Sequence, residues 1–587
     1  MCSFPSGLPF FIPCKEVRKI KYDKKMGLYL PDSVRPQNKG YGEAGASWRK
    51  KSVKGFNAPS GSPHEDIDFN NFTMRQRARM LYMASPIATS AIKTNRTNVV
   101  GIGLKLKSRI DREVLGLSPD QAEEWQKTTE REFSLWANNK RACDATGMNN
   151  FYGLQQLALI SWLLSGDCIG LLKQYKTERL FPYALRVHLI ESDRIATPGG
   201  YGASTSIFYT TGKNTDTGNT IYDGVEVDSN GMVVAYHIRS TYPFEVGAPT
   251  TTWARVLAYQ EHTGLPNVIH VVDCERPDQY RGVSYLAQVI EPLLQLRRYT
   301  ESELMAAVIE SFFTAFIKTE APTDENPFNE VEPEDPTVPK GPNEYHMGPG
   351  QINVMEPGED VTFAEPKHPN GSFDAFAKAI CEQVGAALEI PSDLLLKSFN
   401  ASYSASRAAL LEAWKAFKMR REWLADDFCR PIYEVWMSEA VARGRIYAPG
   451  FFDNPAIRAA YLGSEWLGPS QGQLDPTKEI TAEILACSEG FSTHEQSTIR
   501  LNGGQWDANV EQLVRENEKL GGQSPDPHQN GGSSQQEPTE PAEGEGSDEN
   551  NPHNPETARR RGREALRSLV ITEQIKQAIK GGQGNET

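Results

Sequence analysis

Residues 282–318 read GVSYLAQVIEPLLQLRRYTESELMAAVIESFFTAFIK, and this run decides how the chain is organised. Apolar and helix-favouring residues continue almost without interruption, which predicts one long helix that leads into a strand. A second helical run follows at residues 373–388, after an insertion. Two helices joined through an insertion, in a chain without a catalytic constellation, indicate a part that assembles with copies of itself.

The insertion itself is not helical. Residues 320–342 contain six prolines and seven acidic residues, and Lys340 is their one basic residue. Proline inside a helix removes a backbone hydrogen bond and clashes with the preceding turn. This segment therefore joins a strand at residues 314–319 to another candidate strand at residues 351–355.

The length of the chain predicts several structural regions. Its 587 residues exceed the size at which single hydrophobic cores stop growing, about 250–300 residues, so two to four regions are expected. No stretch approaches the roughly 18 uninterrupted apolar residues of a membrane span. The apolar run at residues 8–13 is too short and proline-broken for a signal peptide, which predicts that the chain is cytoplasmic at synthesis.

Charge and cysteine content narrow the functional classes. The net charge is −14, whereas a protein that grips nucleic acid normally presents a basic face. The acidic total argues against a static DNA clamp, but not against a smooth channel through which DNA slides. The eight cysteines are scattered and form no CxxC pair, which favours buried or idle thiols over a metal site or disulfides.

Residues 1–70 are polar, rich in glycine and proline, and basic in patches, which predicts a flexible arm. The basic side chains either contact nucleic acid or another subunit, or belong to a solvated tail, and the tail is favoured. These side chains are Lys15, Arg18, Lys19, Lys21, Lys24 and Lys25.

Three capped helices are expected after the arm. Ser85 and Pro86 begin a helix at residues 86–99. Ser118 and Gln121 form a capping box at the start of the next helix. A third helix at residues 151–164 ends at Gly166. Their aromatic stripe favours a packed core over a cofactor site, and it includes Trp125, Phe133, Trp136 and Trp162.

A sheet region follows, because the hydrophobic period changes to two. Strands are expected at residues 169–175, 185–191 and 269–273. Residues 223–239 predict a hairpin around Asn230 and Gly231, which supply the positive φ of a tight turn. The loop at residues 199–219 is rich in glycine, serine and threonine, so it is expected to be mobile.

The C-terminal part begins with a predicted loop. Ile390 and Pro391 end the second helical run, and SDLLLKSFNASYSASR then carries many small and hydroxyl residues. A long amphipathic helix starts near Ser404, and Pro431 breaks or kinks it. Further helices are expected at residues 476–490 and 493–502.

The last residues predict a disordered tail. Residues 521–556 contain eight acidic residues and no lysine or arginine, a composition that disfavours a packed core. A basic cluster at residues 559–563 and an amphipathic run at residues 566–579 then predict a short helix. This helix either docks on a partner or remains unattached.

The chain carries no recognisable catalytic, cofactor-binding or metal motif. It has no Walker A loop, GxSxG elbow or HExxH pair. Glu191 and Asp193 could hold a metal ion as in a nuclease, but an ion pair with Arg194 explains them better. Asp426 and Asp427 are adjacent on a helix and face different directions. A nuclease and a scaffold or adaptor of another kind are the competing hypotheses to a structural channel.

The order of these segments resembles the portal protein of lambda-type tailed bacteriophages. The resemblance covers residues 71–504 and rests on long blocks rather than short motifs. These blocks are NVVGIGLKLKSR from Asn98, NFYGLQQLALISWLLSGDC from Asn150, LIESDRIATP from Leu189, DGVEVDSNGMVVAYHI from Asp223, RPDQYRGVSYLAQVIEPLLQLRRYTESELMAAVIESFFTAFIK from Arg276, GAALEIPSDLLLKSFNASYSASRAALLEAWKAF from Gly385, and GQLDPTKE from Gly472.

This resemblance implies a non-enzymatic ring, typically of twelve subunits, at one vertex of a viral capsid. Double-stranded DNA would pass through it during packaging and ejection. The implied partners are the terminase large subunit, head-completion and connector proteins, and the major capsid and scaffold proteins. The location is the virion, with host cytoplasm during assembly, and no cofactor, metal or membrane is implied.

The resemblance also implies an α+β portal fold with a mixed α/β wing, a two-helix stem, a small α/β clip and an α-helical crown. By position, the regions are a flexible arm (1–70), wing (71–281), first stem helix (282–311), clip with the acidic segment (312–369), second stem helix (370–390), tunnel loop (391–403), wing helix and return (404–468), crown (469–520) and disordered tail (521–587).

Two sets of site residues follow from this partition. The tunnel loop would expose Ser392, Asp393, Lys397, Ser398, Asn400, Ser402 and Tyr403 to DNA. Lys397 would contact phosphate transiently, or it is solvated or paired with Asp393, and both alternatives stay open. A ring has heterologous faces, so stem apolar residues would be buried against neighbours. These are Leu293, Leu296, Val308 and Phe312.

Overall fold

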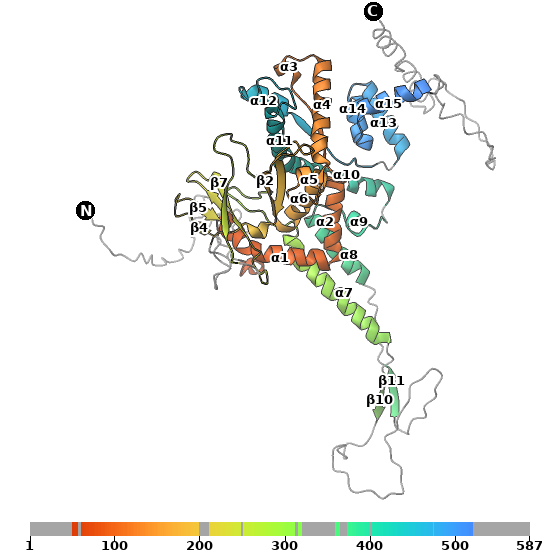
Figure 1. Cartoon of the computed structure of the whole chain (residues 1–587). Helices are drawn as coiled ribbons and strands as arrows, with labels where there is room; N and C mark the ends of the chain where they lie inside the picture. The colour runs from red at the N-terminus through yellow and green to blue at the C-terminus, as the bar shows by residue number, and fades with distance from the viewer. Residues whose placement is uncertain are drawn as a thin grey trace, which may run out of the picture. The chain divides into compact units, whose positions relative to one another are not determined.

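The computed structural model describes residues 50–56, 60–198, 211–247, 250–311, 315–319, 359–363, 373–399, 402–472 and 475–519 (Figure 1). Residues Met1–Asn509 form one compact unit and Val510–Thr587 form another. Residues 1–49 of the arm expected at residues 1–70, the candidate strand at residues 351–355 and the tail beyond Lys519 lie outside the described residues. Residues 64–70 of that arm are helical rather than flexible, because their apolar side chains pack on the rest of the chain.

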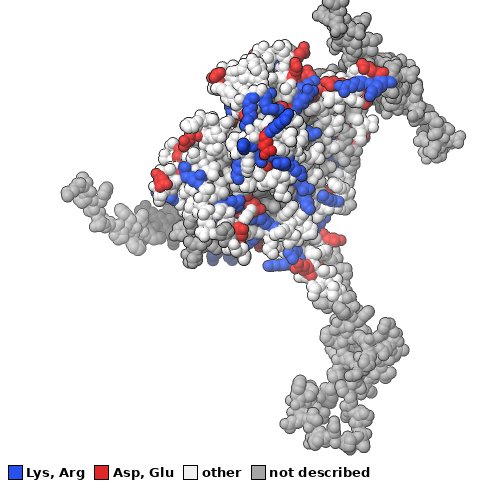
Figure 2. All heavy atoms as spheres, in the orientation of Figure 1, with Lys and Arg blue, Asp and Glu red and all other residues white. Residues whose placement is uncertain are grey.

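Charged side chains of both signs are interspersed over the face of the molecule shown in Figure 2. That face lacks the single-sign basic field typical of proteins that bind nucleic acid tightly. In the described part of the chain, no helix is both long and apolar enough to span a bilayer.

Ser85 separates the first two α-helices, since one ends before it and the next begins after it. A 3-10 turn (η2, Lys51–Val53) and a π turn (η3, His64–Asp68) precede α1 (Phe69–Ala84), and α2 (Pro86–Val99) follows. The Ser85 side chain accepts from the Ala88 N–H, so the predicted start of α2 is confirmed. Sequence periodicity missed α1 because its buried face carries Asn71 and Arg75 among the apolar residues.

The predicted capping residues are confirmed in α4 (Pro119–Ala137) and α6 (Phe151–Ser165). Ser118 and Gln121 form both halves of the capping box. Gly166 ends α6 with φ of 90°, a left-handed conformation that favours glycine. The short helices α3 (Arg112–Leu115) and α5 (Lys140–Cys143) flank α4.

Two antiparallel sheets form the β region. The first has the order β3-β2-β9, with β2 at Asp167–Gln174, β3 at Leu185–Ile190 and β9 at Val268–Val272, as predicted to within two residues. A 3-10 turn, η4 (Ser192–Arg194), follows β3. The second sheet runs β4-β5-β6-β7-β8, with strands at Thr211–Lys213, Thr220–Tyr222, Val225–Val227, Val233–Arg239 and Trp253–Leu257.

The predicted hairpin is confirmed as β6 and β7, which pair with a register shift. Its turn uses positive φ at Gly231 (85°) and not at Asn230. The Asp228 carboxylate fixes the turn by accepting from the Asn230 and Met232 N–H groups, each at 2.8 Å. The loop at residues 199–219 was expected to be mobile. Residues 199–210 are outside the described part, and the following residues form β4, because β4 pairs with β5 through backbone hydrogen bonds.

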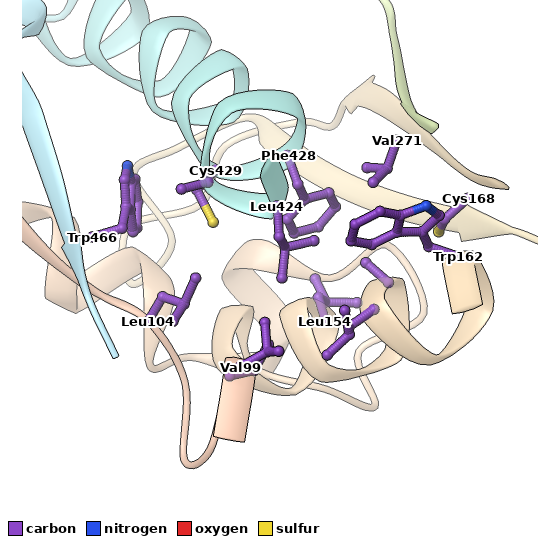
Figure 3. Packing of buried hydrophobic residues seen from close by; sticks show 14 of the residues in the cluster. Val99, Leu104, Leu154, Trp162, Cys168, Val271, Leu424, Phe428, Cys429 and Trp466 are labelled. Carbon is purple, nitrogen blue, oxygen red and sulfur yellow. The ribbon is translucent and has the colours of Figure 1, made fainter. Parts of the chain in front are cut away.

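We call residues 69–290 and 403–467 the α/β body, and the centre of its hydrophobic core is built from aromatic side chains. Phe133 is 1% exposed and lies at the centre of this packing. Its ring contacts five others at centroid distances of 5.0 to 5.8 Å, those of Trp136, Phe151, Tyr433, Trp436 and Trp466. Figure 3 shows a neighbouring part of the same cluster, where Leu154 and Trp162 of α6 face Leu424 and Phe428. The aromatic stripe is therefore core, as predicted.

The long C-terminal helix was predicted to break or kink at Pro431, and the structure shows no break there. Its parts are α10 (Tyr403–Leu424), a π turn (η6, Ala425–Cys429) and α11 (Arg430–Ala442). Pro431 is the second residue of α11, and the irregularity is the π turn before it. The π turn ends two residues before Pro431, which has no backbone N–H, and its Phe428 and Cys429 lie in the core.

The remaining elements close the chain. They are α12 (Pro455–Leu462), β12 (Ser464–Leu467), which pairs with β1 (Lys105–Ser108), α13 (Pro476–Ser488), α14 (His494–Asn502) and α15 (Trp506–Lys519). Helices were predicted at the positions of α13 and α14. The six cysteines in the described ranges are free thiols, and four of them are buried.

Candidate stem, loop and subunit-contact site

The first stem helix begins later than predicted. Residues 282–286 are irregular, a 3-10 turn (η5) covers Ala287–Val289, and α7 runs Ile290–Ser311. Gly282 crosses Gly166 so closely that a Cβ on Gly282 would lie 1.8 Å from the Gly166 carbonyl oxygen. The Tyr285 N–H also donates to the Leu163 carbonyl at 2.9 Å. These tertiary contacts override the helical propensity of residues 282–289.

A buried ion cluster fixes the chain just before the stem. Arg281 is fully buried, and its guanidinium donates to the carboxylates of Asp167 at 2.6 Å and Asp223 at 2.8 Å. It also donates to the carbonyls of Ser192 and Ile195, each at 3.0 Å. Arg281 therefore connects both sheets to the root of α7.

Arg75 of α1 completes this cluster, at 3.7 Å from Asp167 and 3.5 Å from Asp223. Burial alone would raise the pKa of Asp167, but Arg281 and Arg75 outweigh it and hold that pKa well below its usual range. Burial raises the pKa of Asp223 to about 6, although the same arginines oppose the shift. No sequence motif marked these residues, because their partners are more than 50 positions apart.

The second stem helix is α8 (Phe373–Ala387), which packs against α7. The Tyr299 ring of α7 stacks on Phe373 at 5.4 Å and meets Phe376 edge-on at 5.0 Å. Beyond the helices, β10 (Ala315–Thr319) pairs antiparallel with β11 (Glu359–Phe363) (Figure 1). The strand expected at residues 314–319 is thus confirmed as β10, and its partner is β11.

The predicted tunnel loop is partly helical. Ser392–Leu396 form α9, whose Leu395 side chain is 1% exposed and belongs to the core. The Leu395 carbonyl accepts from the Ser90 hydroxyl of α2 at 2.7 Å. Burial of Leu395 stabilises one helical turn that the small and hydroxyl residues did not predict. The exposed part of the segment is therefore shorter than residues 391–403.

Lys397 ends α9 in the left-handed conformation, with φ of 56°. Its side chain is exposed and forms no ion pair with Asp393 within the described ranges. Phe399 beside it is 55% exposed. Ser398 is exposed, Ser402 caps α10, and Tyr403 is the first residue of α10. Asn400 lies outside the described residues.

Arg420 of α10 fixes the start of this segment. It is 6% exposed, donates to Glu389 at 2.6 Å, and donates to the side-chain oxygen of Asn95 in α2 at 3.1 Å. Its guanidinium also lies 4.9 Å from the centre of the Tyr285 ring. One cation therefore joins α10, α2, the end of α8 and the segment before α7.

Two hollows flank α8 and α9. One of about 750 Å³ lies between α7, α8, α9 and the corner of α1 and α2. Its walls include Leu296, Thr300, Ala377 and Leu396. The other, of about 610 Å³, lies between α8 and α10, with Ala386, Ala413 and Met419 in its walls. The loop thus emerges between two concave, mostly apolar surfaces.

The predicted stem contact residues divide into two groups. Leu293 and Leu296 are 1% and 6% exposed within the single chain, so their burial does not require a neighbour. Val308 is 43% exposed, and Leu304 and Met305 near it are exposed as well. Phe312 lies outside the described residues. The apolar face of α7 is therefore covered at its root and exposed toward its end.

The acidic pairs do not form a metal centre in the described ranges. The Asp193 carboxylate accepts a short hydrogen bond from Arg79 of α1, and Glu191 lies 3.9 Å from the same guanidinium. The predicted partner was wrong: Arg194 points to the Arg239 carbonyl at 3.0 Å, because the backbone of η4 turns it away. An ion pair explains these carboxylates.

Asp426 and Asp427 do face different directions. Asp426 pairs with Arg430 one turn later. Asp427 is partly buried, and burial raises its pKa to about 6, with a further contribution from Asp273. The two carboxylates therefore do not share an ion.

The helices α7 and α8 leave apolar side chains exposed toward the end of α7, and an exposed apolar surface of this kind marks an interaction site. Comparison with known proteins gives the family. A family model described as "Phage portal protein, lambda family" matches residues 49–421. The chain belongs to the lambda family of phage portal proteins, the class that forms the portal ring at a capsid vertex.

Solved structures that contain similar chains include two gene transfer agent assemblies and one portal protein. A chain in the virion of a native gene transfer agent particle is 16% identical, with TM-score 0.36, over 67% of this chain and 93% of that one. A chain in the neck of that particle, computed with C12 symmetry, is 13% identical, with TM-score 0.37, over 74% and 93%. An HK97-family phage portal protein from Corynebacterium diphtheriae is 12% identical, with TM-score 0.27, over 69% and 96%.

Proposed function

We propose that this chain assembles into a closed ring, with twelve subunits, through which double-stranded DNA passes during packaging and ejection. The observation that carries the proposal is the α7–α8 pair, whose apolar face is buried at its root and exposed toward its end. Heterologous contacts between copies close into a ring when the rotation between them closes. The ring itself makes and breaks no bonds, and a partner ATPase supplies the energy.

The subunit contact on α7 is made by its exposed apolar side chains. Leu304, Met305 and Val308 form this contact, together with Phe312 as the family resemblance implies. Leu293 and Leu296 hold the root of α7 in its own subunit. The hollow beside them accepts part of the neighbouring subunit, because its walls are apolar and concave.

The segment after α9 lines the channel. Lys397 makes a transient phosphate contact, since it is exposed and forms no ion pair with Asp393 among the described residues. Ser392, Asp393, Ser398, Asn400, Ser402 and Tyr403 complete this segment. A single lysine in each subunit gives weak contacts, which suit a DNA that must slide.

The remaining assignments rest on the family. The wing is residues 71–281 and 404–468, the stem is 282–311 and 370–390, the clip is 312–369 and the crown is 469–520. The terminase large subunit docks during filling, and head-completion and connector proteins replace it. Major capsid and scaffold proteins surround the ring, which forms in the host cytoplasm and remains in the virion.

Negative-stain microscopy of the purified protein tests the proposal. We expect uniform rings with a central hole for the natural sequence. Leu304→Asp should abolish the rings, because it places a charge in the proposed contact. Leu135→Asp is the matched control, since Leu135 of α4 is exposed to a similar extent, 63% against 65%. Monomers that cleave DNA with added Mg²⁺ would instead support the nuclease.

A further inference from the structure

One face of the β2–β3 pair carries two cations in directly opposite positions. Lys173 of β2 lies opposite Arg186 of β3 in the antiparallel register, and both side chains are partly exposed. Directly opposite side chains in a sheet have Cβ atoms about 5 Å apart, and like charges placed there destabilise the pairing. The two cations therefore weaken the sheet unless an anion lies between them.

Three further cations lie around this pair. Lys176 and Arg179 are exposed in the loop that joins β2 to β3, and Arg141 of α5 lies 4.9 Å from the centre of the Phe181 ring in that loop. Residues 173–188 contain four basic and one acidic side chain, a formal charge of +3, in a chain of net charge −14. We call five side chains the cation face: Arg141, Lys173, Lys176, Arg179 and Arg186.

The cation face forms no ion pair within the described ranges. Asp144 is buried at the end of α5. Its carboxylate accepts from the N–H groups of Thr146, Met148 and Asn149 at 2.8, 3.1 and 2.9 Å, so it holds its own loop together. Glu178 in the β2–β3 loop is exposed and pairs with none of the five cations. The positive charge of this face is therefore not compensated by the described part of the chain.

The two central cations are held in place. The Arg186 guanidinium lies 4.5 Å from the centre of the Tyr175 ring, and its Nε atom is buried without a hydrogen-bond partner among the described residues. The Lys173 ammonium donates to Nδ1 of His188 at 2.7 Å. Burial and the charge of Lys173 lower the pKa of His188, so its ring is neutral at pH 7. Cations that are already fixed lose little freedom when they bind an anion.

Protection of a sheet edge does not explain these cations. β3 is at the edge of the sheet β3-β2-β9, and edge strands often carry charges that prevent pairing with other chains. This edge is already covered where Arg186 lies, because the Ala145 N–H donates to the Val187 carbonyl of β3 at 2.9 Å. Lys173 belongs to the central strand β2, which pairs on both sides.

The surroundings of the cation face favour an acidic peptide over DNA. Phosphate contacts dominate affinity for nucleic acid, and five cations on a chain of net charge −14 attract a DNA duplex only weakly. Leu180 in the β2–β3 loop is 81% exposed, and Tyr175 is 38% exposed. Exposed apolar side chains beside cations fit a segment that carries both carboxylates and apolar side chains.

We propose that the cation face binds an acidic peptide segment of a separate protein. Carboxylates of that segment pair with Lys173 and Arg186 through charge-assisted hydrogen bonds, and an apolar side chain of the segment packs on Leu180. The bound carboxylates remove the repulsion between the two opposite cations. This contact does not depend on ring formation. A DNA duplex and a second copy of this chain are the competing occupants.

Fluorescence anisotropy of a labelled poly-L-glutamate peptide with the full chain tests the cation face. Arg186→Gln should weaken binding about tenfold, because it removes a charge-assisted contact. Lys173→Gln should weaken binding to a similar extent. Lys418→Gln is the matched control for the lost charge and should leave binding unchanged. Lys418 of α10 is also exposed and forms no ion pair in the described ranges.

Thermal unfolding of the same proteins separates binding from folding. Without peptide, Lys173→Gln should not lower the unfolding midpoint, because it removes one of two opposite like charges. Loss of binding at undiminished stability then assigns the effect to the cation face. A lower midpoint for this variant would instead show that the cations stabilise the sheet, which contradicts the proposal.

Three binding results would also overturn the proposal. The first is no peptide binding by the natural chain, or equal affinity in the natural chain, Arg186→Gln and Lys418→Gln. The second is tighter binding of a DNA duplex of equal formal charge, lost in Arg186→Gln, which identifies nucleic acid as the ligand. The third is altered self-association of Arg186→Gln in sedimentation velocity, which identifies a second copy. Rings are counted by microscopy in the same samples, so failure of the ring is a separate readout.

Discussion

The α/β body and the α13–α14 hairpin both contain packed helices, but these helices are stabilised in different ways. In the body, Phe133 contacts five aromatic rings and is 1% exposed. In the hairpin, Phe491 is 85% exposed and the central contact is the Glu483 carboxylate. The end of α7 resembles the hairpin, since Leu304 is 65% exposed.

This difference separates what one chain stabilises from what an assembly stabilises. The body buries its apolar surface alone, which contributes about 25 cal/mol per Å². The end of α7 and the hairpin leave apolar surface in water, so they gain this contribution only when something covers them. Substitutions in the body should therefore affect folding, and substitutions at the exposed faces should affect association.

Arg281→Ala should have the largest effect on folding. It leaves Asp167 and Asp223 buried without their main cation and opens a cavity, so the free energy of unfolding should fall by about 5 kcal/mol. Chemical denaturation followed by circular dichroism measures this loss. Arg297→Ala is the control, because its pair with Glu301 is exposed and should cost less than about 1 kcal/mol. Equal losses in the two variants would contradict the role of the cluster.

Phe133→Ala should follow, with a loss of about 4 kcal/mol. The substitution removes a ring from the centre of the aromatic cluster, and the neighbouring rings cannot fill the space fully. Denaturation midpoints of this variant and of Phe452→Ala give the comparison, since Phe452 is 59% exposed. If both variants lost the same stability, the body would not be held by this cluster.

Asp427→Asn should stabilise the body in a pH-dependent way. The pKa of Asp427 is raised to about 6 by burial and by Asp273, so its ionised form is disfavoured in the folded chain. Above pH 6 the neutral amide should therefore add about 1–2 kcal/mol, after allowance for solvent screening. The gain should vanish as the pH falls from 6 to 4, where the natural carboxyl becomes protonated.

Thermal unfolding at pH 7.5 and pH 4.5 measures this dependence. Asp426→Asn is the control, since Asp426 pairs with Arg430 at the surface. A gain for Asp427→Asn that is equal at both pH values would show that its carboxyl is not strained by burial.

Leu304→Asp should have the smallest effect on the subunit, within about 0.5 kcal/mol, because the side chain is already in water. Its effect on association should be large by contrast. Sedimentation velocity of this variant and of Leu135→Asp measures how much of each protein is single subunits and how much is assembled. A variant that assembles normally would place the subunit contact away from α7.

Local residue patterns predicted much of the fold. The capping box of Ser118 and Gln121, the Ser85 cap and the Gly166 terminus all depend on neighbours within four positions, and the structure confirms them. Several long sequence blocks in a fixed order also predicted the family, and the match to residues 49–421 confirms it.

Long-range contacts account for the errors. α7 begins at Ile290 because Gly282 and Tyr285 are fixed by the end of α6. Asp193 pairs with Arg79, which is 114 positions away, rather than with the adjacent Arg194. The sequence analysis did not identify Arg281 and Arg420 as the residues that join several elements, because their partners are also far away in the sequence. Their importance lies in burial and in partners from several elements, which no local pattern records.

The crossing of Gly166 and Gly282 restricts how this protein can vary. A side chain on Gly282 would overlap the carbonyl of Gly166, and one on Gly166 would lie 2.4 Å from the Gly282 backbone. Neither overlap involves a movable side chain, so no substitution elsewhere relieves it by repacking. In a saturation library selected for a folded chain, these two positions should tolerate nothing but glycine, because both lie buried within the single chain.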